Sequence, residues 1–422
     1  MEEIIAVLEK YNFWDGKLPA VGFVRDTYLK RIQGFVGNKL IKVFVGQRRA
    51  GKSYLLRQLI QYLVQTGVNP KNILYINKEY TDFDFLTGSG KLQELVSLYT
   101  SHIKPKGRIY LFLDEVQDIQ GWEHVVNSYS QDYTTDFEIF LSGSNSRMLS
   151  GELAGMLSGR YISFQIFPFS FQEFAGILNM DNPKEAFLQY MQTGGLPELF
   201  HLPDQETKRH YMSAIKDTVM LRDIIQRQNI KDARLLEDLF AFLVNNASNL
   251  ISISSIVKYF KGKNRKTNYE TISSYIDCLQ NAFLVHKAER YSVKGKEIIS
   301  GTCKYYINDP AFKNYIYPGF DSGIGYFLEN IVFLQLAMAG YKVYVGHFRN
   351  REVDFIATYN ARTIYFQVAY LLADQQTTER EYSALESIPD NYEKFIVSLD
   401  DVLMSDRKGI KHIQAWHLDK IL

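Results

Sequence analysis

One stretch decides how this chain folds: Gly46-Gln47-Arg48-Arg49-Ala50-Gly51-Lys52-Ser53. It fits the pattern G-x-x-x-x-G-K-[ST], in which the backbone N–H groups of a loop surround a phosphate group. Gly46 and Gly51 would let the backbone approach the phosphate closely, because a Cβ atom at either position would block it. Lys52 would place its charge at the β- and γ-phosphates, and the Ser53 hydroxyl would bind Mg²⁺. The stretch therefore predicts a phosphate site for a nucleoside triphosphate.

The residues on both sides of this stretch supply the context that it requires. Ile41–Val45 has the pattern of a buried strand, and the leucines of residues 53–64 recur at the spacing of a helix. A strand before the loop and a helix after it direct the partial positive charge of the helix N-terminus at the phosphate. We include Tyr54, in the first turn of that helix, with residues 46–53 as nucleotide-binding residues.

Three more apolar runs of strand length follow, and amphipathic segments separate them. The runs are Ile73–Ile76, Ile109–Leu113 and Phe137–Leu141. Strands that alternate with helices predict a parallel sheet covered on both faces, so the fold class of this part is α/β. Residues 1–40 predict one or two short helices before the first strand.

The pattern of the remaining chain changes twice. Helical patterns replace the strand patterns over residues 175–250, and residues 251–300 have the pattern of helix, turn, helix and hairpin. After Asp309-Pro310 the pattern is mixed α/β again. It predicts a helix over residues 326–339 and strands over residues 342–345, 353–358, 364–369 and 394–398, the last of which we take as the final strand.

The apolar run Ile109–Leu113 ends in two acidic residues, Asp114 and Glu115. A phosphate loop needs such a second strand, because carboxylates near the metal complete the site. Asp114 would hold Mg²⁺ through water, and Glu115 would polarise the attacking water as the catalytic base. A solvated acidic turn is the alternative interpretation, and the phosphate loop disfavours it.

The apolar run Phe137–Leu141 continues into Ser142-Gly143-Ser144-Asn145-Ser146. In ATPases with a polar sensor, a residue at the end of the strand beside the acidic one contacts water or the γ-phosphate. Asn145 is our first choice for this role, and Ser144 is the alternative. A Gly/Ser turn in which Asn145 caps the next helix is the other interpretation.

The nucleotide is predicted to be ATP rather than GTP. Guanine-binding proteins use an N-K-x-D motif, whereas Asn77-Lys78-Glu79-Tyr80 lacks the Asp and lies too early in the chain. ATP and Mg²⁺ are therefore the expected cofactors.

Composition points to a soluble chain of several domains. The 422 residues predict roughly two to four domains, and Lys+Arg 48 against Asp+Glu 47 excludes a strongly basic or acidic protein. Two cysteines cannot build a disulfide framework or a zinc cluster. Met1-Glu2-Glu3 lacks the basic start of a signal peptide, and the apolar stretch near Ile331–Ala339 is too short to span a bilayer. We expect a cytoplasmic protein without a membrane partner.

Several segments resemble a large family of prokaryotic AAA-type ATPases. The phosphate loop and Leu113-Asp114-Glu115-Val116-Gln117 are shared with many families; the more specific segments are Leu157-Ser158-Gly159-Arg160, Pro168-Phe169-Ser170-Phe171-Gln172-Glu173-Phe174 and Gly194-Gly195-Leu196-Pro197-Glu198. The resemblance implies an AAA-type ATPase core over residues 1–172 and a helical lid over residues 173–248. It further implies a winged helix over residues 249–305 and a small restriction-endonuclease-like α/β domain over residues 306–422.

The resemblance also implies a role for Arg160. AAA ATPases complete the site with a cation at the γ-phosphate, an arginine finger or a sensor arginine. Arg160 follows the sensor strand by one helix, the usual neighbourhood of such a residue. A salt bridge within residues 157–164 is the alternative, and Arg222 is a weaker candidate.

The predicted winged helix carries a local excess of positive charge. The segment from Lys258 to Lys304 contains ten Lys or Arg residues and four Asp or Glu residues. Such groups contact the phosphates of nucleic acid, so duplex DNA is a candidate partner. A scaffold that binds a protein, or a solvated basic loop, is the alternative. The candidate contacts are Lys261, Lys263, Arg265, Lys266, Lys294 and Lys296.

The predicted C-terminal domain resembles a nuclease that has lost its chemistry. Restriction-type endonucleases place a helix Glu, a strand Asp and a Glu-x-Lys pair around their metal ions. Glu329 and Asp354 match the first two, but Gln367 and Ala369 stand in place of the Glu-x-Lys pair. Gln is a poor Mg²⁺ ligand and Ala cannot activate water, so we expect a degenerate site without a nearby cation and without cleavage.

The leading hypothesis is a Mg²⁺-dependent, ATP-hydrolysing switch or remodeller of AAA type whose C-terminal domains bind a partner, DNA or a protein. The alternatives are an ATP-dependent nuclease or defence-type effector, and a signalling switch with slow turnover. Lys52 and Glu115 together favour hydrolysis over mere binding, whereas Gln367 and Ala369 disfavour a nuclease.

Overall fold

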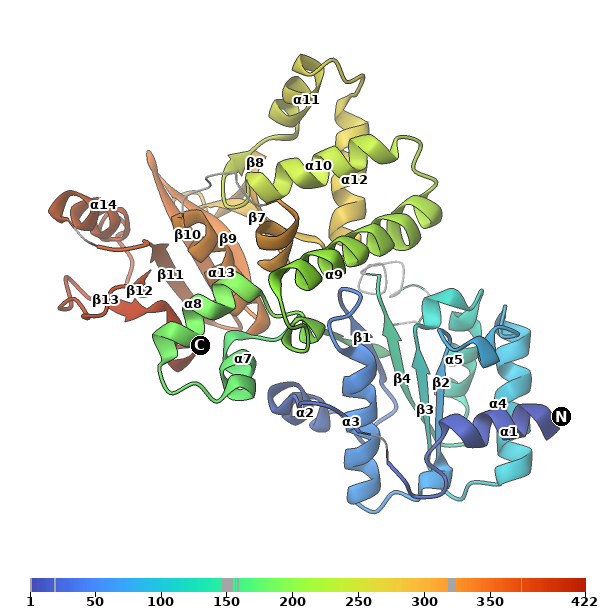
Figure 1. The fold of residues 1–422 in the computed structure, drawn as a ribbon. Helices are drawn as coiled ribbons and strands as arrows, with labels where there is room; N and C mark the ends of the chain where they lie inside the picture. Colours follow the sequence, from blue (N-terminus) through green and yellow to red (C-terminus); the bar gives the residue numbers. More distant parts are fainter. Residues whose placement is uncertain are drawn as a thin grey trace. The chain divides into compact units, whose positions relative to one another are not determined.

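The computed structural model describes residues 2–18, 20–145, 155, 157, 159–317, 324–372 and 374–422. The chain divides into two compact units, Met1–Ile166 and Phe167–Leu422, and each unit has its own sheet (Figure 1). Four parts were expected from the sequence, and that finer division stays a prediction.

The first unit is built on a five-stranded parallel sheet in the order β2-β3-β4-β1-β5. Its strands are β1 (Ile41–Val45), β2 (Ile73–Asn77), β3 (Ile109–Asp114), β4 (Phe137–Gly143) and β5 (Tyr161–Gln165). The first four confirm the predicted strands. The sequence did not predict β5, because this edge strand fully buries only Phe164 and therefore has no apolar run.

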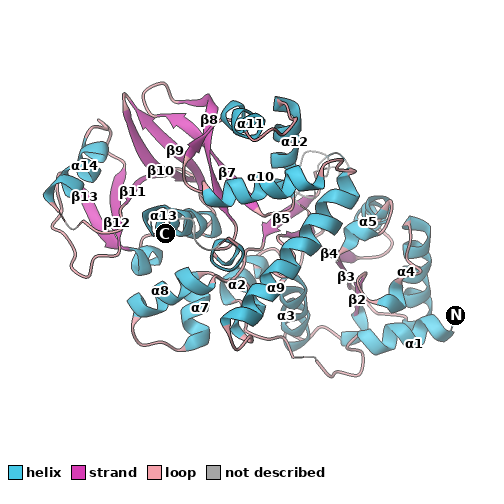
Figure 2. Cartoon of the chain, turned by 45° about the horizontal axis from the view of Figure 1, so that its top comes forward, coloured by secondary structure: helices cyan, strands magenta, loops and turns pink. Residues whose placement is uncertain are grey.

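Helices cover both faces of this sheet, as the alternating pattern predicted (Figures 1 and 2). On one face, leucines of α3 and α2 pack against Phe44, Phe112 and Phe140. The other helices, α4 and α5, lie on the opposite face, with α1 beside α4. The helices are α1 (Glu2–Tyr11), α2 (Asp26–Gln33), α3 (Lys52–Gln65), α4 (Ser89–Ile103) and α5 (Trp122–Gln131).

The second unit holds a mixed eight-stranded sheet in the order β13-β12-β11-β10-β9-β7-β8-β6. The strands are β6 (Leu250–Ile251), β7 (Val285–Ser292), β8 (Glu297–Ile307), β9 (Lys342–Phe348), β10 (Arg351–Tyr359), β11 (Arg362–Val368), β12 (Glu393–Ser398) and β13 (Ile410–Gln414). The helices are α7 (Phe171–Leu178), α8 (Pro183–Thr193), α9 (Gln205–Thr218), α10 (Ala233–Asn245), α11 (Ile253–Gly262), α12 (Tyr269–Asn281), α13 (Ile324–Met338) and α14 (Gln375–Glu386). The sequence analysis missed β13 and α14.

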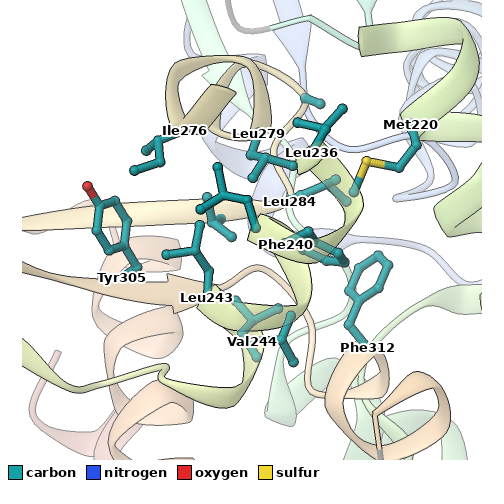
Figure 3. Packing of buried hydrophobic residues seen from close by; sticks show 14 of the residues in the cluster. Met220, Leu236, Phe240, Leu243, Val244, Ile276, Leu279, Leu284, Tyr305 and Phe312 are labelled. Atoms are coloured by element: carbon teal, nitrogen blue, oxygen red, sulfur yellow. The ribbon is translucent and has the colours of Figure 1, made fainter. Parts of the chain in front are cut away.

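The helix, turn, helix and hairpin predicted over residues 251–300 are confirmed as α11, α12, β7 and β8. Their core is apolar and also includes α10 (Figure 3). Phe240 of α10 and Leu279 of α12 are fully buried there, and Tyr305 of β8 lies in the same cluster.

One strand explains why the boundary expected between residues 305 and 306 does not separate two domains. Successive side chains of a strand point to opposite faces. Tyr305 therefore packs with α10 and α12, whereas Tyr306 packs with α13 in a second cluster. The strand β8 thus belongs to both cores.

The boundary expected at residue 172 also lies earlier in the structure, at Ile166. Phe167 and Phe171 are buried in the cluster around α13, together with Phe187 and Tyr190 of α8. The helices α7 and α8 therefore share a core with the second sheet instead of forming a lid of their own.

Candidate nucleotide site

The order of the strands brings three sequence segments to one edge of the first sheet. β4 lies between β1 and β3, with Val45 beside Gly143 and Leu113 beside Leu141. Since all three strands are parallel, the segments that follow them meet at their carboxyl ends, the edge where open α/β sheets bind ligands. These segments are the phosphate loop, the acidic pair and residues 142–145.

The phosphate loop opens α3 without a side-chain cap. Gly51 is the N-cap residue with φ of 94°, a left-handed conformation that glycine adopts readily. Arg49 also has a positive φ, of 69°. The N-cap residue Gly51 makes no side-chain hydrogen bond to the first N–H groups of α3. These groups and the helix dipole therefore form a site suited to an anion.

The structure shows a second reason why position 46 requires glycine, in addition to the close approach of a phosphate. A Cβ atom at this position would overlap the carbonyl oxygen of Ile166, the residue after β5. Ile166 also donates its N–H to the carbonyl oxygen of Val45 at 2.7 Å. Close packing against the unpredicted strand β5 therefore requires glycine here.

Lys52 lies buried at the centre of the site. Its Nζ donates to the carbonyl oxygens of Gly46, at 3.2 Å, and Gln47, at 3.3 Å. The same Nζ lies 3.4 Å from Oε1 of Glu115. The predicted phosphate lysine and the predicted base are thus direct neighbours.

Asp114 is enclosed by hydrogen-bond donors. Its Oδ2 accepts from the Tyr75 hydroxyl at 2.8 Å and from Nδ2 of Asn77 at 3.2 Å, and its Oδ1 accepts from the Ser142 hydroxyl. Burial, followed by repulsion from Glu115, raises the pKa of Asp114 above its ordinary value.

The residues predicted to hold Mg²⁺ fit that ion. The Ser53 hydroxyl is hydrogen-bonded to the carboxylate of Asp114, so the two predicted ligands are adjacent. Hydroxyl and carboxylate oxygens are hard ligands of the kind that Mg²⁺ prefers, and Mg²⁺ usually keeps several waters and binds phosphate as well.

Glu115 is held in a fixed orientation. Its φ of 55° turns the chain sharply after β3, and its N–H donates to the Ser142 hydroxyl at 3.1 Å. Burial alone would raise the pKa of its carboxyl group. Attraction by Lys52 and then Arg48 outweighs burial, with help from a hydrogen bond to Gln117, and lowers the pKa. Glu115 is therefore ionised at neutral pH, as a general base must be.

The structure contradicts a role for Arg160 in its own phosphate site. The carbonyl oxygen of Arg160 accepts from the N–H of Ile41 at 2.9 Å, so Arg160 precedes β5 where β1 begins. The phosphate loop follows the other end of β1, which is about 15 Å away for a strand of this length. A position shortly after the sensor strand in the sequence therefore does not show which end of the sheet Arg160 occupies.

The other predicted residues near the loop have different surroundings. Ser144 is buried and Asn145 is half-buried at the end of the described segment, whereas Ser146 lies outside it. Arg48 is buried and paired with Glu79. Tyr54 is half-exposed, and the guanidinium of Arg57 lies 4.2 Å from its ring centroid.

Sequence reasoning missed the groups that hold the acidic pair. Tyr75 and Asn77 of β2 and Ser142 of β4 all bond to Asp114, and Gln117 bonds to Glu115. Polar residues at the carboxyl ends of apolar strands were the signal that could have identified Asn77 and Ser142.

The nuclease-like residues lie in the second unit around a cavity of about 830 Å³. Glu329, Asp354, Gln367 and Ala369 all line it. The expectation that no cation is nearby is wrong, because Lys304 of β8 lines the same cavity. It was missed because it comes from a strand outside the predicted domain.

Lys304 is buried among three carboxylates. Its Nζ lies 2.7 Å from Glu352, 2.8 Å from Glu329 and 3.6 Å from Asp354. Burial raises the pKa of Glu329 to about 8, with a further contribution from Asp354, and burial raises the pKa of Asp354 to about 6. Among the described residues, no group of three or more acidic, His or Cys side chains is arranged to hold a metal ion.

The candidate nucleic-acid contacts are not equivalent. Arg265 forms an ion pair with Asp238 of α10, so its charge is already paired within the protein. Nζ of Lys263 lies 4.7 Å from the ring centroid of Tyr259. The remaining four are exposed, and none forms an ion pair with a described residue: Lys261, Lys266, Lys294 and Lys296.

Comparisons with known proteins show the family of the chain. Residues 38–175 match a family described as an AAA domain, and residues 184–322 match a domain of unknown function (DUF8612). An uncharacterised protein of Haemophilus influenzae is 35% identical over 400 residues, which cover 93% of this chain and 98% of that protein. The chain belongs to the family of that protein. As a family member with an AAA domain, it has the P-loop core of an AAA-type ATPase.

A second member of this family comes from an archaeon. An uncharacterised protein of Methanocaldococcus jannaschii is 30% identical over 377 residues, which cover 86% of this chain and 80% of that protein. Neither relative has an assigned activity, so the site itself must carry the argument about function.

Solved structures resemble the chain more weakly. A Walker-type ATPase of Pyrococcus abyssi is 17% identical, with a TM-score of 0.48 over 70% of this chain and 95% of that one. The ORC2 protein of Aeropyrum pernix is 13% identical, with a TM-score of 0.36 over 74% of this chain and 92% of that one. Within the described ranges, no helix has the length and apolar character needed to cross a membrane.

Proposed function

We propose that this AAA-type protein binds ATP with Mg²⁺ and hydrolyses it. The observation that carries the proposal is the position of the ionised Glu115 carboxylate, 3.4 Å from the phosphate lysine Lys52. A protein that only bound nucleotide would need Lys52 and the loop, but not a buried carboxylate with a lowered pKa beside them.

Each residue of the site would have one task in this reaction. The loop N–H groups and Lys52 would bind the phosphates, and Glu115 would accept a proton from the attacking water. Ser53 and Asp114 would hold Mg²⁺, which neutralises the charge that develops on the phosphates. The hydrogen bonds to Asp114 would keep that carboxylate in place.

We further propose that the second unit binds duplex DNA as the partner of the ATPase. The exposed lysines at the end of α11, in the turn before α12 and at the tip of the β7–β8 hairpin support this, because these elements follow one another as helix, turn, helix and hairpin. Contacts of this kind bind phosphates without reading sequence. Association would therefore be weak, salt-dependent and largely independent of sequence.

The residues around Lys304 are better suited to stabilising the folded second unit than to cleaving DNA. The ammonium group of Lys304 is already held by three carboxylates, and Gln367 and Ala369 supply neither a charged ligand nor a base. We propose that the unmodified protein does not cut DNA with Mg²⁺ or Mn²⁺. Cleavage that disappears in Asp354→Ala would contradict this.

The proposed activity can be tested by measuring ATP turnover of the purified protein with Mg²⁺ and with EDTA, in the presence and absence of duplex DNA. We expect turnover that requires Mg²⁺ and that Lys52→Ala abolishes. Turnover that survives in Lys52→Ala would show that it comes from another site or from a contaminant.

A further inference from the structure

The turn that follows the acidic pair brings one more side chain into the nucleotide site. Val116–Asp118 forms a 3₁₀ turn directly after Glu115. The turn carries Gln117 back to the carboxylate of Glu115, and its Nε2 donates to Oε2 at 2.6 Å. The motifs in the sequence give Gln117 no task, yet it makes the shortest hydrogen bond that Glu115 accepts among the described contacts.

The two oxygens of Glu115 have different partners. Oε1 lies 3.4 Å from Nζ of Lys52, and Oε2 accepts from Gln117. A carboxylate held at both oxygens has one orientation. Orientation matters because a general base must lie within hydrogen-bond reach of the proton it removes, and a misplacement of about 1 Å costs on the order of 10²-fold in rate.

The same amide group reaches the loop after β4. Nε2 of Gln117 lies 3.5 Å from the hydroxyl oxygen of Ser144, which is buried. Two residues earlier, the Ser142 hydroxyl contacts both Glu115 and Asp114. Gln117 therefore connects the base to the residue that precedes Asn145.

The carbonyl oxygen of the Gln117 side chain is the second feature that points to a bound molecule at this site. Oε1 of Gln117 is buried and has no hydrogen-bond partner among the described residues. Nearly all buried polar atoms of proteins have a partner, so an atom without one marks a place for a donor. A water molecule bound by Glu115 would be such a donor.

We propose that Gln117 is the positioning residue for Glu115: its amide group holds the carboxylate in the orientation that activates water. This inference rests on the proposed ATPase function. Gln117 acts through Glu115, and its role differs from that of the loop residues, which bind the nucleotide itself.

The test compares Gln117→Leu, which keeps the size but removes the amide, with wild type. We expect kcat to fall by about 10- to 100-fold while the Kd for ATP changes less than about threefold. Gln120→Leu, the same substitution at an exposed position three residues on, is the control and should leave both quantities unchanged.

A double-mutant cycle separates positioning from a general structural role. With Glu115→Gln present, Gln117→Leu should change the remaining single-turnover rate less than about threefold, because the group it positions is gone. Gln117→Glu keeps the shape but repels Glu115, and it should reproduce the loss of kcat if Gln117→Leu folds poorly.

The outcomes distinguish this inference from the proposed function. Two outcomes would overturn the role of Gln117 but leave the ATPase proposal intact. In the first, the wild-type protein turns over ATP and both Gln117 variants keep its kcat. In the second, the rate losses of Glu115→Gln and Gln117→Leu multiply in the double mutant. A wild-type protein that binds ATP without any turnover would overturn the ATPase proposal, and the positioning role with it.

Discussion

Oδ2 of Asp309 accepts a hydrogen bond of 2.9 Å from the N–H of Gly195. Oδ1 accepts another of 2.8 Å from the N–H of Ala311. Gly194 has a φ of 82°, and a Cβ atom there would overlap Asp309. The Gly-Gly-Leu-Pro segment of the second unit is therefore explained by close packing of backbone around one buried carboxylate, and two predictions follow from it.

The first prediction concerns Gly195→Ala. The new Cβ atom would overlap the carbonyl oxygen of Phe169, so backbone must shift, and we expect the free energy of unfolding to fall by about 1–3 kcal/mol. Gly262→Ala is the control, because nothing lies within 4 Å of a Cβ atom at the end of α11. Chemical denaturation measures both variants; equal stabilities would contradict the packing argument.

The second prediction concerns pH. Burial raises the pKa of Asp309 to about 7 in the folded protein, against a reference value of 3.8. Between these values the folded state holds a proton that the unfolded state has lost, so stability falls as pH rises, by up to about 1.4 kcal/mol per pH unit.

Glu329 and Asp354 contribute in the same direction, since their pKa values are also raised. Denaturation of wild type and of Asp309→Asn at pH 5, 6, 7 and 8 isolates the contribution of Asp309. The variant should show a shallower slope below pH 7, although it is less stable because its amide replaces one acceptor. Parallel curves would show that Asp309 does not titrate as expected.

The third prediction concerns Lys304→Met. Removal of the ammonium group leaves the carboxyl groups of Glu329, Glu352 and Asp354 together without the cation that they contact, and we expect a loss of about 3–5 kcal/mol in unfolding free energy. Lys287→Met is the matched control, because its ion pair with Glu289 is solvent-exposed and contributes less than about 1 kcal/mol. A similar effect of both substitutions would mean that the cluster around Lys304 is not stabilising.

The fourth prediction concerns DNA. Replacement of Lys261, Lys266, Lys294 and Lys296 with Gln should weaken binding to duplexes of any sequence and reduce the dependence of log Kd on log salt concentration. Arg265→Gln should lower stability and affect binding less, because Arg265 is paired with Asp238. Fluorescence anisotropy at several salt concentrations measures both effects; unchanged binding by the fourfold variant would exclude this surface.

The first unit could be predicted from sequence far better than the second. Buried parallel strands appear as apolar runs, and β1 to β4 were found for that reason. The strand β5 lacks such a run, because only Phe164 of its five residues is fully buried, and this hid β5 and with it the position of Arg160. The acidic pair was found because it follows an apolar strand, whereas Gln117 depends on how the chain turns after Glu115.

The cavity of the second unit shows a different limit. Glu329 and Asp354 could be located from a known pattern, but Lys304 comes from β8, a strand assigned to another domain. Pairing between β7 and β9 joins the two regions into one sheet, and long-range pairing of this kind leaves no local signal in the sequence. Side-chain clusters built across such pairings appear only in the structure.

The central claim is that Glu115 is the base of an ATPase, and Glu115→Gln tests it most directly. The amide keeps the size of the side chain and leaves Lys52 and the phosphate loop in place, but it cannot accept the proton. Single-turnover hydrolysis and ATP affinity should be measured together on the variant and on wild type. We predict an affinity within about threefold of wild type and a rate lower by about 10²-fold or more. A variant that hydrolyses ATP at the wild-type rate would contradict the claim.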